Sequence, residues 1–400
     1  MWSFPMDYLY GLLNLSFTGY VIVTLVMVQI TIMGVTLYLH RDQAHRSVDL
    51  HPVLRHFFRL WVWMTSGMLT KEWVAVHRKH HALCEVEGDP HSPKVFGLPK
   101  VLFEGAELYQ IEQKKPETLE KYGRGTPDDW LERNVYHRYP SGGIVAMVLI
   151  DLLLFGVPGI IIIAAQMVTM PLFAAGVING LGHHSGYRNF ETDDASTNIF
   201  PWAVLVGGEE LHNNHHAFPS SSKFSIRPWE FDIGWLYLKV FSALGLAKIR
   251  RTAPQPELVE TSRSVDLDTV RAVVLNRMHV LREYTKSVSL PVLKNAMREA
   301  DREVHKAMRK ARGLIKRQSA LLDEKSRARI RALVDSDTAM KTVHEYRERL
   351  KMLWNGAHDS NERLLQHLRE WCAQAEASGI QVLKDFAVSL RGYHLAADPA

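Results

Sequence analysis

The sequence predicts an all-α integral membrane protein with a histidine-rich cap on its cytoplasmic side and a soluble helical C-terminal region. Two stretches are almost free of charge: residues 8–39 contain no charged side chain, and residues 141–180 contain only Asp151. Each is longer than the roughly 20 apolar residues that cross a bilayer as a helix. From about residue 255 the chain is instead dense in Arg, Lys and Glu. We therefore expect a membrane-embedded domain over residues 1–250 and a soluble, charged α-helical region over residues 255–400.

The first apolar stretch is expected to form one tilted span over about residues 16–39. At roughly 1.5 Å per residue, a helix of this length is too short for two crossings. Residues 1–39 contain no Lys or Arg, whereas basic residues begin at Arg41. The positive-inside rule then places the short N-terminus outside and His40 in the cytoplasm.

The second apolar stretch is expected to form two spans, residues 143–156 and 159–179, because "GVPG" at 156–159 interrupts it. An even number of crossings returns the chain to the cytoplasm. The apolar segment 53–70 contains Arg55, His56 and Arg59, and a crossing there would separate the histidines on its two sides. We expect it to lie in the interface. The prediction is a multi-pass protein of a bacterial inner membrane, with three spans and every histidine cluster facing the cytoplasm.

Composition excludes several other classes of protein. The two cysteines, Cys84 and Cys372, form neither a disulfide framework nor a CxxC motif, which fits a reducing compartment. The N-terminus lacks a basic region, so the first apolar run is expected to be a retained anchor and not a signal peptide. The formal charge of +5 is explained by Lys and Arg at a cytoplasmic leaflet, so nucleic acid is not expected as a partner.

The histidine spacing indicates metal ligands. With 20 histidines in 400 residues, an HxxHH pattern is expected by chance only about 0.05 times. Two copies occur, at His77, His80 and His81 and at His212, His215 and His216. Residues at i, i+3 and i+4 share one face of a helix, so each copy is expected to direct three imidazoles into one volume. Isolated histidines such as His51, His56, His137 and those beyond residue 250 are expected to be structural or exposed.

Two further elements lie at the cytoplasmic ends of the expected spans. His40 and His45 in "HRDQAH" are about 140 degrees apart on a regular helix and cannot both point the same way. Either the span ends between them, or they serve different metals. Asn179 and His183 are related by i+4 at the end of the third span, where the Asn amide can hold a metal-bound water.

About nine imidazoles are too many for one four-coordinate zinc, so two metals are indicated. Nitrogen-rich sites with open positions suit iron that activates dioxygen, although the ligand types do not exclude zinc, copper or manganese. The chain has one ExxH motif, Glu209 to His212, whereas carboxylate di-iron bundles use two. Glu209 is therefore expected to orient a ligand from outside the ligand shell. His91 and His184 are expected to have structural or similar outer roles.

These motifs, in this order, resemble the membrane fatty acyl desaturases of the stearoyl-CoA desaturase type over roughly residues 15–245. The resemblance rests on "HRDQAH", "EWVAVHRKHH", "GDPH", "NGLGHHSGYR" and "GEELHNNHHAFP". It implies a histidine-rich catalytic cap in which Asn179 acts through water and two iron ions are held by His40, His45, His77, His80, His81, His183, His212, His215 and His216. It departs from the family in having one expected span before the first box instead of two.

The resemblance also implies the reaction and its participants. The family converts an acyl chain into a cis alkene, usually at the delta-9 position, with dioxygen and two electrons from a separate carrier. That carrier is expected to be ferredoxin-like or rubredoxin-like and to be served by an NAD(P)H reductase. An unactivated methylene requires metal and dioxygen chemistry, because no acid, base or nucleophile among the side chains could remove its hydrogens. Acyl-CoA, an acyl carrier protein and membrane phospholipid stay open as the carrier of the acyl chain.

Alternatives and the remaining regions complete the prediction. A lipid hydroxylase shares the first hydrogen abstraction, and a membrane metal transporter would instead need ligands within the spans.

Trp61, Trp63, Trp73 and Trp202 are candidates for an apolar slot, for interfacial anchoring or for core packing. The segment "LPVLKNAMREADREVHKAMRKARGLIKRQ" predicts amphipathic helices in a bundle. That C-terminal region could serve homo-oligomerisation, the electron donor or anionic lipid, or be a solvated appendage.

Overall fold

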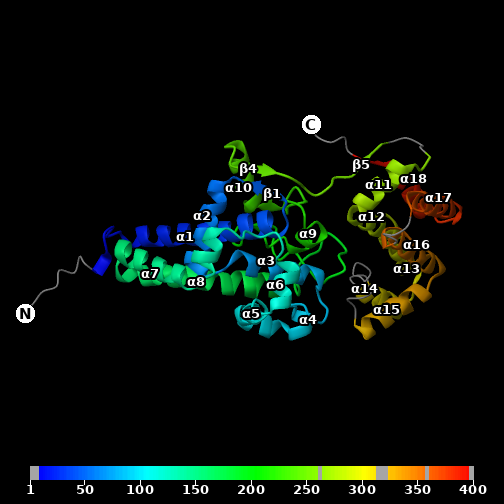
Figure 1. Ribbon diagram of the computed structural model, residues 1–400. Helices are drawn as coiled ribbons and strands as arrows, with labels where there is room; N and C mark the ends of the chain where they lie inside the picture. The colour runs from blue at the N-terminus through cyan, green and yellow to red at the C-terminus, as the bar shows by residue number, and fades with distance from the viewer. Residues whose placement is uncertain (1–8, 260–263, 312–322, 356–359, 396–400) are drawn as a thin grey trace, which may run out of the picture. The chain divides into compact units, whose positions relative to one another are not determined.

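The computed structural model describes residues 9–259, 264–311, 323–355 and 360–395. Its contacts divide the chain into two compact units (Figure 1). Unit 1 comprises Met1–Arg188 and Asp194–Ala253, and unit 2 comprises Asn189–Asp193 and Pro254–Ala400. Helices dominate both units, which confirms the helical fold class, and the described strands form only two-stranded sheets. The boundaries expected from the sequence did not include the short excursion of Asn189–Asp193 into unit 2.

Unit 1 is built mainly from helices, with a long connection between η4 and α9. Its elements are α1 Phe17–Met33, η2 Gly34–Ala44, α2 Pro52–Ser66, α3 Thr70–Ala82, α4 Pro93–Phe96, α5 Leu98–Glu112, α6 Pro116–Tyr122, η3 Glu132–Tyr136, α7 Gly142–Phe155, α8 Val157–Thr169, η4 Met170–Leu181, α9 His212–Ala217 and α10 Ile233–Ala243. The strands β1 Val48–Leu50 and β4 Ala247–Ile249 pair antiparallel, and β2 Trp202–Ala203 and β3 Phe231–Asp232 pair parallel. The η elements are π-helices.

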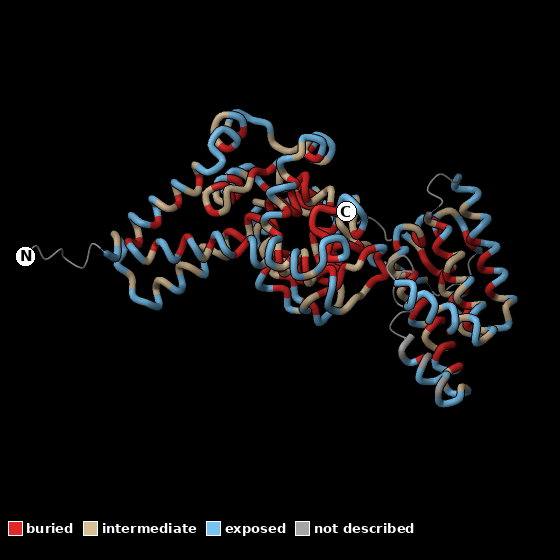
Figure 2. The backbone as a smooth tube through the Cα atoms, turned by 90° about the horizontal axis from the view of Figure 1, so that it is seen from below, coloured by how far each residue is buried: buried red, intermediate tan, exposed pale blue. Residues whose placement is uncertain are grey.

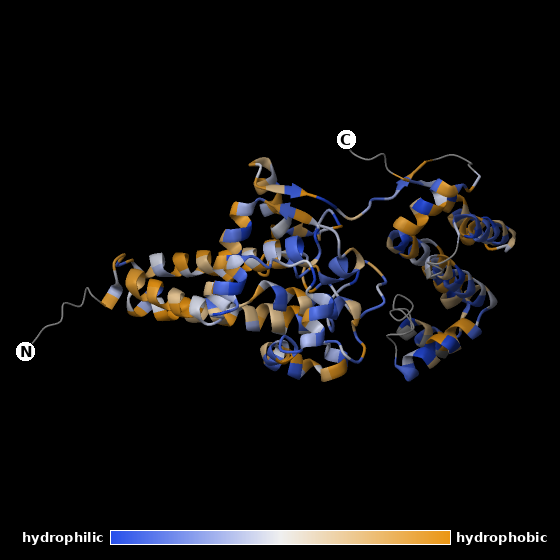
Figure 3. Cartoon of the chain, viewed as in Figure 1, coloured by the Kyte–Doolittle hydropathy of each residue, from blue (hydrophilic) through white to orange (hydrophobic). Residues whose placement is uncertain are grey.

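Among the described residues, two continuous helices are long and apolar enough to cross a membrane: Phe17–Ala44, with 28 residues, and Val157–Leu181, with 25. Figure 3 shows the apolar colouring along much of α1, α7 and α8. Helix α7 coincides with the expected second span, but its 14 residues reach only about 21 Å, which is less than the roughly 30 Å hydrocarbon core. Gly156, at φ +64°, turns the chain from α7 into α8. The three-span topology therefore stays a prediction.

Apolar side chains on these helices face outward. Leu25 on α1 is 63% exposed, Leu149 on α7 is 62% exposed and Ile161 on α8 is 70% exposed. The same helices, next to the N-terminus in Figure 2, are largely exposed or half-exposed. Soluble monomers rarely expose a contiguous apolar surface of this kind. Such a surface suits contact with lipid.

Helix α2 packs against α1 and α7. Gly34 lies so close to it that a Cβ there would be 2.7 Å from Val62 Cγ1, and the Trp61 indole donates a hydrogen bond to Thr31 Oγ1 at 3.0 Å. The buried Arg59 guanidinium pairs with Asp129 and Glu132. The opposite face of α2 is exposed at Val53 and Leu60. This amphipathic helix is the segment that we expected to be interfacial, and its position at the interface stays a prediction.

Unit 2 is a helical bundle with its own core. Its helices are α11 Leu267–Leu275, α12 Arg277–Tyr284, η5 Thr285–Ser289, α13 Leu290–Glu299, α14 Arg302–Ala311, α15 Glu324–Asp335, α16 Thr338–Asn355, α17 Asn361–Ala377 and α18 Gln381–Arg391. Strand β5 Glu257–Leu258 pairs antiparallel with β6 Tyr393–His394.

The core of unit 2 is centred on Tyr284, Trp371 and Phe386. The ring centroids of Tyr284 and Phe386 are 4.9 Å apart, and those of Trp371 and Phe386 are 5.9 Å apart. The Tyr284 hydroxyl and the Trp371 indole each donate to a backbone carbonyl of α16, so their polar ends are satisfied inside the core. The amphipathic helices predicted here are present as α13 and α14, and residues 312–318 of the quoted segment lie outside the described residues.

Candidate metal centre

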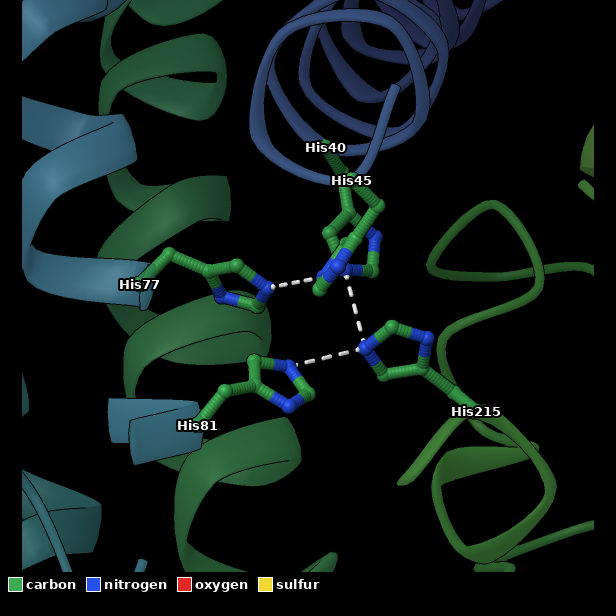
Figure 4. Close-up of side chains that lie close together, drawn as sticks. All are labelled: His40, His45, His77, His81 and His215. Atoms are coloured by element: carbon green, nitrogen blue, oxygen red, sulfur yellow. Dashed lines mark hydrogen bonds between the residues drawn. The ribbon is translucent and has the colours of Figure 1, made fainter. Parts of the chain in front are cut away.

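The nine histidines of the predicted site meet in two neighbouring groups. Cluster A consists of His40, His45, His77, His81 and His215 (Figure 4). Cluster B consists of His80, Cys84, His183 and His216, together with His212, whose Nε2 lies 2.9 Å from His183 Nε2. The structure thus brings all nine together, while their role as iron ligands stays a prediction.

Each HxxHH motif is divided between the two clusters, which corrects the expectation that its three imidazoles share one volume. On α3, His77 and His81 join cluster A and His80 joins cluster B. Residues four apart on a helix differ by about 40 degrees, whereas the adjacent His80 and His81 differ by about 100 degrees. The i, i+4 pair therefore shares one cluster, and the intervening histidine reaches the other.

Helix α9 repeats this division in reverse. His215 belongs to cluster A, and His216 and His212 lie with His183 in cluster B. The His81 and His216 rings, from different clusters and different helices, stack with their centroids 4.4 Å apart. Two helices thus each carry ligands for both clusters.

A π-helix resolves the geometry of "HRDQAH". The backbone N–H of His45 donates to the carbonyl of His40 at 3.0 Å, the i→i+5 bond of a π-helix. Residues five apart are then about one turn apart, so both side chains point into cluster A, with ring centroids 4.8 Å apart. A regular α-helix would separate the two side chains, and two different metals would then be one explanation of the motif. Because η2 ends at Ala44 and both histidines lie in cluster A, the structure favours the other alternative, a helix end.

The imidazole nitrogens are spaced as ligands of a common ion would be. In cluster A, Nε2 of His45 lies 2.8 Å from Nε2 of His77, and Nε2 of His215 lies 3.0 Å from Nε2 of His81. In cluster B, Nε2 of His80 lies 3.1 Å from Nε2 of His183. Imidazoles bind a transition metal at about 2.0–2.1 Å, so ligands at right angles around it are about 2.9 Å apart. The residues therefore fit two metal ions, one in each cluster.

Carboxylates hold four of the imidazoles from behind, each at Nδ1. His40 bonds to Glu209 at 2.6 Å, His80 to Asp89 at 2.9 Å, His183 to Glu85 at 2.9 Å, and His216 to Asp194 at 2.7 Å. When Nδ1–H donates to a carboxylate, Nε2 keeps its lone pair for a metal. Glu209 thus contacts His40 and not His212, its ExxH neighbour.

Sequence reasoning missed Glu85, Asp89 and Asp194. Asp89 belongs to the "GDPH" motif, and all three lie in the acidic stretches "CEVEGD" and "ETDD". Acidic residues next to histidine boxes were the available signal. It could not show which imidazole each carboxylate would meet, because the Glu85 and His183 pair is separated by 98 residues.

Burial keeps several of these imidazoles neutral. It lowers the pKa of His45 to about 3 and that of His216 to about 4, where the hydrogen bond to Asp194 acts in the opposite direction. Neutral imidazole is the form that binds a metal. Burial raises the pKa of Glu209 to about 8, against the lowering effects of Arg41 and the Thr36 hydroxyl.

The other predicted residues have different surroundings. The His91 ring lies 4.4 Å from that of His80, and His91 forms a third possible metal group with His80 and Asp89. His184 is exposed and its Nδ1 bonds to Ser185 Oγ at 2.6 Å, so it does not join the clusters. Cys84, which we did not predict, has its Sγ 3.8 Å from His80 Nε2.

A cavity of about 460 Å³ adjoins both clusters, within the range of roughly 300–1,000 Å³ usual for small-molecule sites. His40 and His77 of cluster A and His212 of cluster B line it, as does Asn179. The rest of its wall is mostly apolar and includes Ile32, Val35, Met68, Trp73, Val76, Ile144, Met167, Met170, Ala174, Ala175 and Ile178.

Only one of the four candidate tryptophans lines this cavity. Trp73 stacks on His77 at 4.9 Å between ring centroids and is a lining residue. Trp61 bonds to Thr31, Trp63 packs against Tyr136, and Trp202 is 63% exposed. Sequence alone could not separate these four roles.

The cavity extends along the apolar helices. Ile32 lies eight residues before His40 on one continuous helix, and Met170 lies nine residues before Asn179 on another. Another part of the wall is polar: Gln110 of α5 and Gln113, the residue that caps α5, line it, and Gln110 is exposed. The cavity thus combines an apolar interior with a polar border near the surface.

Comparison with known proteins agrees with this geometry. Residues 15–235 match the fatty acid desaturase family model. The chain is 31% identical over 232 residues to delta-9 acyl-lipid desaturase 1 of Arabidopsis thaliana, covering 56% of this chain and 73% of that protein. It is 30% identical to an sn-1 stearoyl-lipid 9-desaturase of Synechocystis (56% and 69% covered) and 32% identical to an acyl-CoA 5-desaturase of Anemone leveillei (54% and 66% covered).

A second family model matches outside this region. Residues 269–396, about a third of the chain and part of unit 2, match a transposase family model. The sequence reasoning did not anticipate this similarity. The expectation that nucleic acid is not a partner stays a prediction.

Proposed function

The chain belongs to the fatty acid desaturase family, and we propose that it inserts a cis double bond at the delta-9 position of a saturated acyl chain. Two C–H bonds on adjacent carbons break and a C=C bond forms. Dioxygen, two electrons and two protons become two molecules of water, so the substrate loses two hydrogens and atoms balance. The observation that supports this proposal best is the apolar cavity whose wall includes histidines of both clusters.

Two iron ions fit the donor set. Cluster A would hold one and cluster B the other, each through imidazole nitrogens, with Asn179 close enough to the cavity to hold a water. Iron with dioxygen supplies the oxidising power that removal of hydrogen from a methylene requires. The protein residues hold the acyl chain and keep bulk water from the buried imidazoles.

The cavity wall favours one orientation of the substrate. The methyl end would lie among Ile32, Met167 and Met170, because burying each methylene is worth about 0.8 kcal/mol. The polar end of the acyl group would lie near Gln110 and Gln113, where amides can hydrogen-bond to it. The carbons between these ends would pass His40, His77 and His212. Trp73, stacked on His77, would hold the chain against the metal side of the cavity.

The carrier and the location are part of the proposal. Relatives are named as acyl-lipid and as acyl-CoA desaturases, and as 9- and 5-desaturases, so either carrier is compatible with the family. We place the protein in a bacterial inner membrane, with the apolar helices in lipid and the clusters on the cytoplasmic side. A separate ferredoxin-like or rubredoxin-like carrier with an NAD(P)H reductase would supply the electrons.

The test is expression of the full chain in a host that makes no unsaturated lipids, supplied with a reductase and carrier and with deuterated stearate. We expect a product that has lost two hydrogen atoms, or two deuterium atoms where the label is at the reacting carbons. The alkene should lie between carbons 9 and 10. A gain of one oxygen would indicate a hydroxylase. No product from wild type, with iron bound and electrons supplied, would refute the proposal. Separation of acyl-CoA from phospholipid after a short pulse identifies the carrier.

A further inference from the structure

We propose that unit 2 holds the loop that carries Asp194 and thereby fixes the His216 imidazole of cluster B. Glu191, Thr285 and Arg347 would then be positioning residues for the metal centre. The inference rests on the proposed function, since it assigns a role in that reaction to Thr285 and Arg347, which lie outside the residues that match the desaturase family model.

The chain itself connects the two units at this loop. Residues up to Arg188 and from Asp194 belong to unit 1, whereas the five residues Asn189–Asp193 belong to unit 2. His183 of cluster B lies just before this excursion, and Asp194, the partner of His216, follows it directly. Contacts that hold Asn189–Asp193 therefore constrain the backbone on both sides of this segment, toward His183 and toward Asp194.

Within unit 2, the excursion has specific anchors. Glu191 Oε1 accepts a hydrogen bond from the Thr285 hydroxyl at 2.6 Å, and its Oε2 pairs with the Arg347 guanidinium. Glu191 and Arg347 are only 5% and 4% exposed. The Phe190 ring packs edge-on against His279, with the centroids 5.1 Å apart. Arg347 also pairs with Glu348 at 3.0 Å, so Glu191 is one of two carboxylates that compensate this buried guanidinium.

Within unit 1, the same loop is closed at its base. The Arg188 guanidinium donates to the carbonyls of Asp194 and Ser196, at 2.9 and 2.7 Å. Asp194 Oδ1 accepts from the Ser196 N–H at 3.0 Å, and its Oδ2 bonds to His216 Nδ1 at 2.7 Å. The carboxylate is thus aimed by its own backbone, and a shift of that backbone would turn it away from the imidazole.

The tether between the anchor and the metal site is short. Glu191 and Asp194 are three residues apart, a span of at most about 11 Å when fully extended. Release of Glu191 would therefore allow the backbone at Asp194 to move, whereas the carboxylates behind His40, His80 and His183 lie outside the excursion. Cluster B should respond more strongly than cluster A.

The experiment uses the full-length protein in membranes and compares Glu191→Gln with Glu376→Gln. The first keeps a group that can bond to Thr285 but removes the charge opposite Arg347. The second is a matched control, because Glu376 pairs with Arg391 at 2.6 Å elsewhere in unit 2. Thr285→Val is a milder variant, because it removes the hydrogen bond to Glu191 and keeps the ion pair with Arg347.

For Glu191→Gln we expect a loss of bound iron after dialysis against a chelator, by about 10-fold or more, as for removal of an outer partner of a ligand. In Mössbauer spectra of the iron-loaded protein, the signal of one iron subsite should change more than that of the other. Thr285→Val should lose less iron than Glu191→Gln. Glu376→Gln should match wild type.

The two proposals can fail separately. If wild type yields no alkene, the proposed function fails regardless of these variants. If wild type yields alkene and Glu191→Gln keeps iron, spectrum and turnover equal to Glu376→Gln, the positioning role is refuted. If Glu191→Gln does not accumulate as folded protein, Thr285→Val decides: wild-type iron retention and spectrum in that variant overturn the inference, and partial loss at one subsite supports it.

Discussion

Replacing Ile32 by Trp should shorten the acyl chain that the enzyme prefers. Ile32 is 4% exposed and lines the cavity, eight residues before His40 on the same continuous helix. If the methyl end lies there, the larger indole occupies space that the last methylenes of an 18-carbon chain would fill. A 16-carbon chain is shorter by two methylenes and would still fit.

The magnitude follows from the methylenes that lose their place. Two methylenes at about 0.8 kcal/mol each amount to about 1.6 kcal/mol, or about a 15-fold change in relative kcat/KM for the two chains. Overpacking can cost a further 1–3 kcal/mol of stability, roughly. Ile32→Phe should therefore show a smaller shift in the same direction with less loss of folded protein.

The assay supplies equal amounts of 16- and 18-carbon substrate and measures both alkenes. Ile22→Trp is the matched control, because Ile22 lies on the same helix, is 56% exposed and is not a lining residue. The reasoning is refuted if an active Ile32→Trp protein keeps the wild-type ratio, or if Ile22→Trp shifts it equally. A shift toward the longer chain would mean that the substrate lies the other way round.

Three further outcomes are expected. Asp89→Asn should lower iron affinity by about 10–100-fold, because the His80 Nδ1–H loses a carboxylate acceptor; iron content after dialysis measures this, and unchanged content would show that Asp89 does not support the ligand. Removal of metal by a chelator should lower the melting temperature in detergent, and iron should restore it. Without a cation, nitrogen lone pairs that are 2.8–3.1 Å apart face one another. An equal melting temperature with and without metal would contradict the assigned clusters. Arg41→Met should destabilise unit 1 by about 3–5 kcal/mol, because both side chains of the Arg41–Asp232 pair are fully buried, whereas Arg133→Met, at an exposed pair, should cost less than about 1 kcal/mol; thermal unfolding of the two variants side by side tests the difference.

The positions of the apolar helices and the two HxxHH motifs could be predicted because each depends on local sequence, whereas the full set of nine histidines follows from the resemblance to the desaturases. Charge-free runs predict long apolar helices, and i, i+3, i+4 spacing predicts a shared helix. The partners behind the imidazoles could not be predicted, because His183 meets Glu85 across 98 residues only after α3 and η4 have been brought together. The conformation of residues 34–44 was also hidden, since nothing in "HRDQAH" distinguishes a π-helix from an α-helix.

Unit 2 shows a different limit of sequence reasoning. Its charge density suggested a solvated appendage as readily as a packed bundle. The deciding residues, Tyr284, Trp371 and Phe386, lie more than 80 residues apart at their extremes, and their packing depends on the tertiary fold. The excursion of Asn189–Asp193 is equally non-local, because Glu191 and Arg347 are separated by 156 residues.

The division of each HxxHH motif between the clusters links the two metal sites mechanically. On α3, His80 serves cluster B and its neighbours His77 and His81 serve cluster A, and α9 carries the reverse arrangement. A metal bound in cluster A therefore fixes the rotation of both helices, and this fixes the histidines that they direct into cluster B. The second ion then meets ligands that are already ordered, so it loses less conformational entropy on binding. Iron loading should be cooperative, and a titration of apo-protein followed by Mössbauer spectroscopy should show little one-iron protein at half loading; a statistical mixture of one-iron forms would mean that α3 and α9 do not couple the sites.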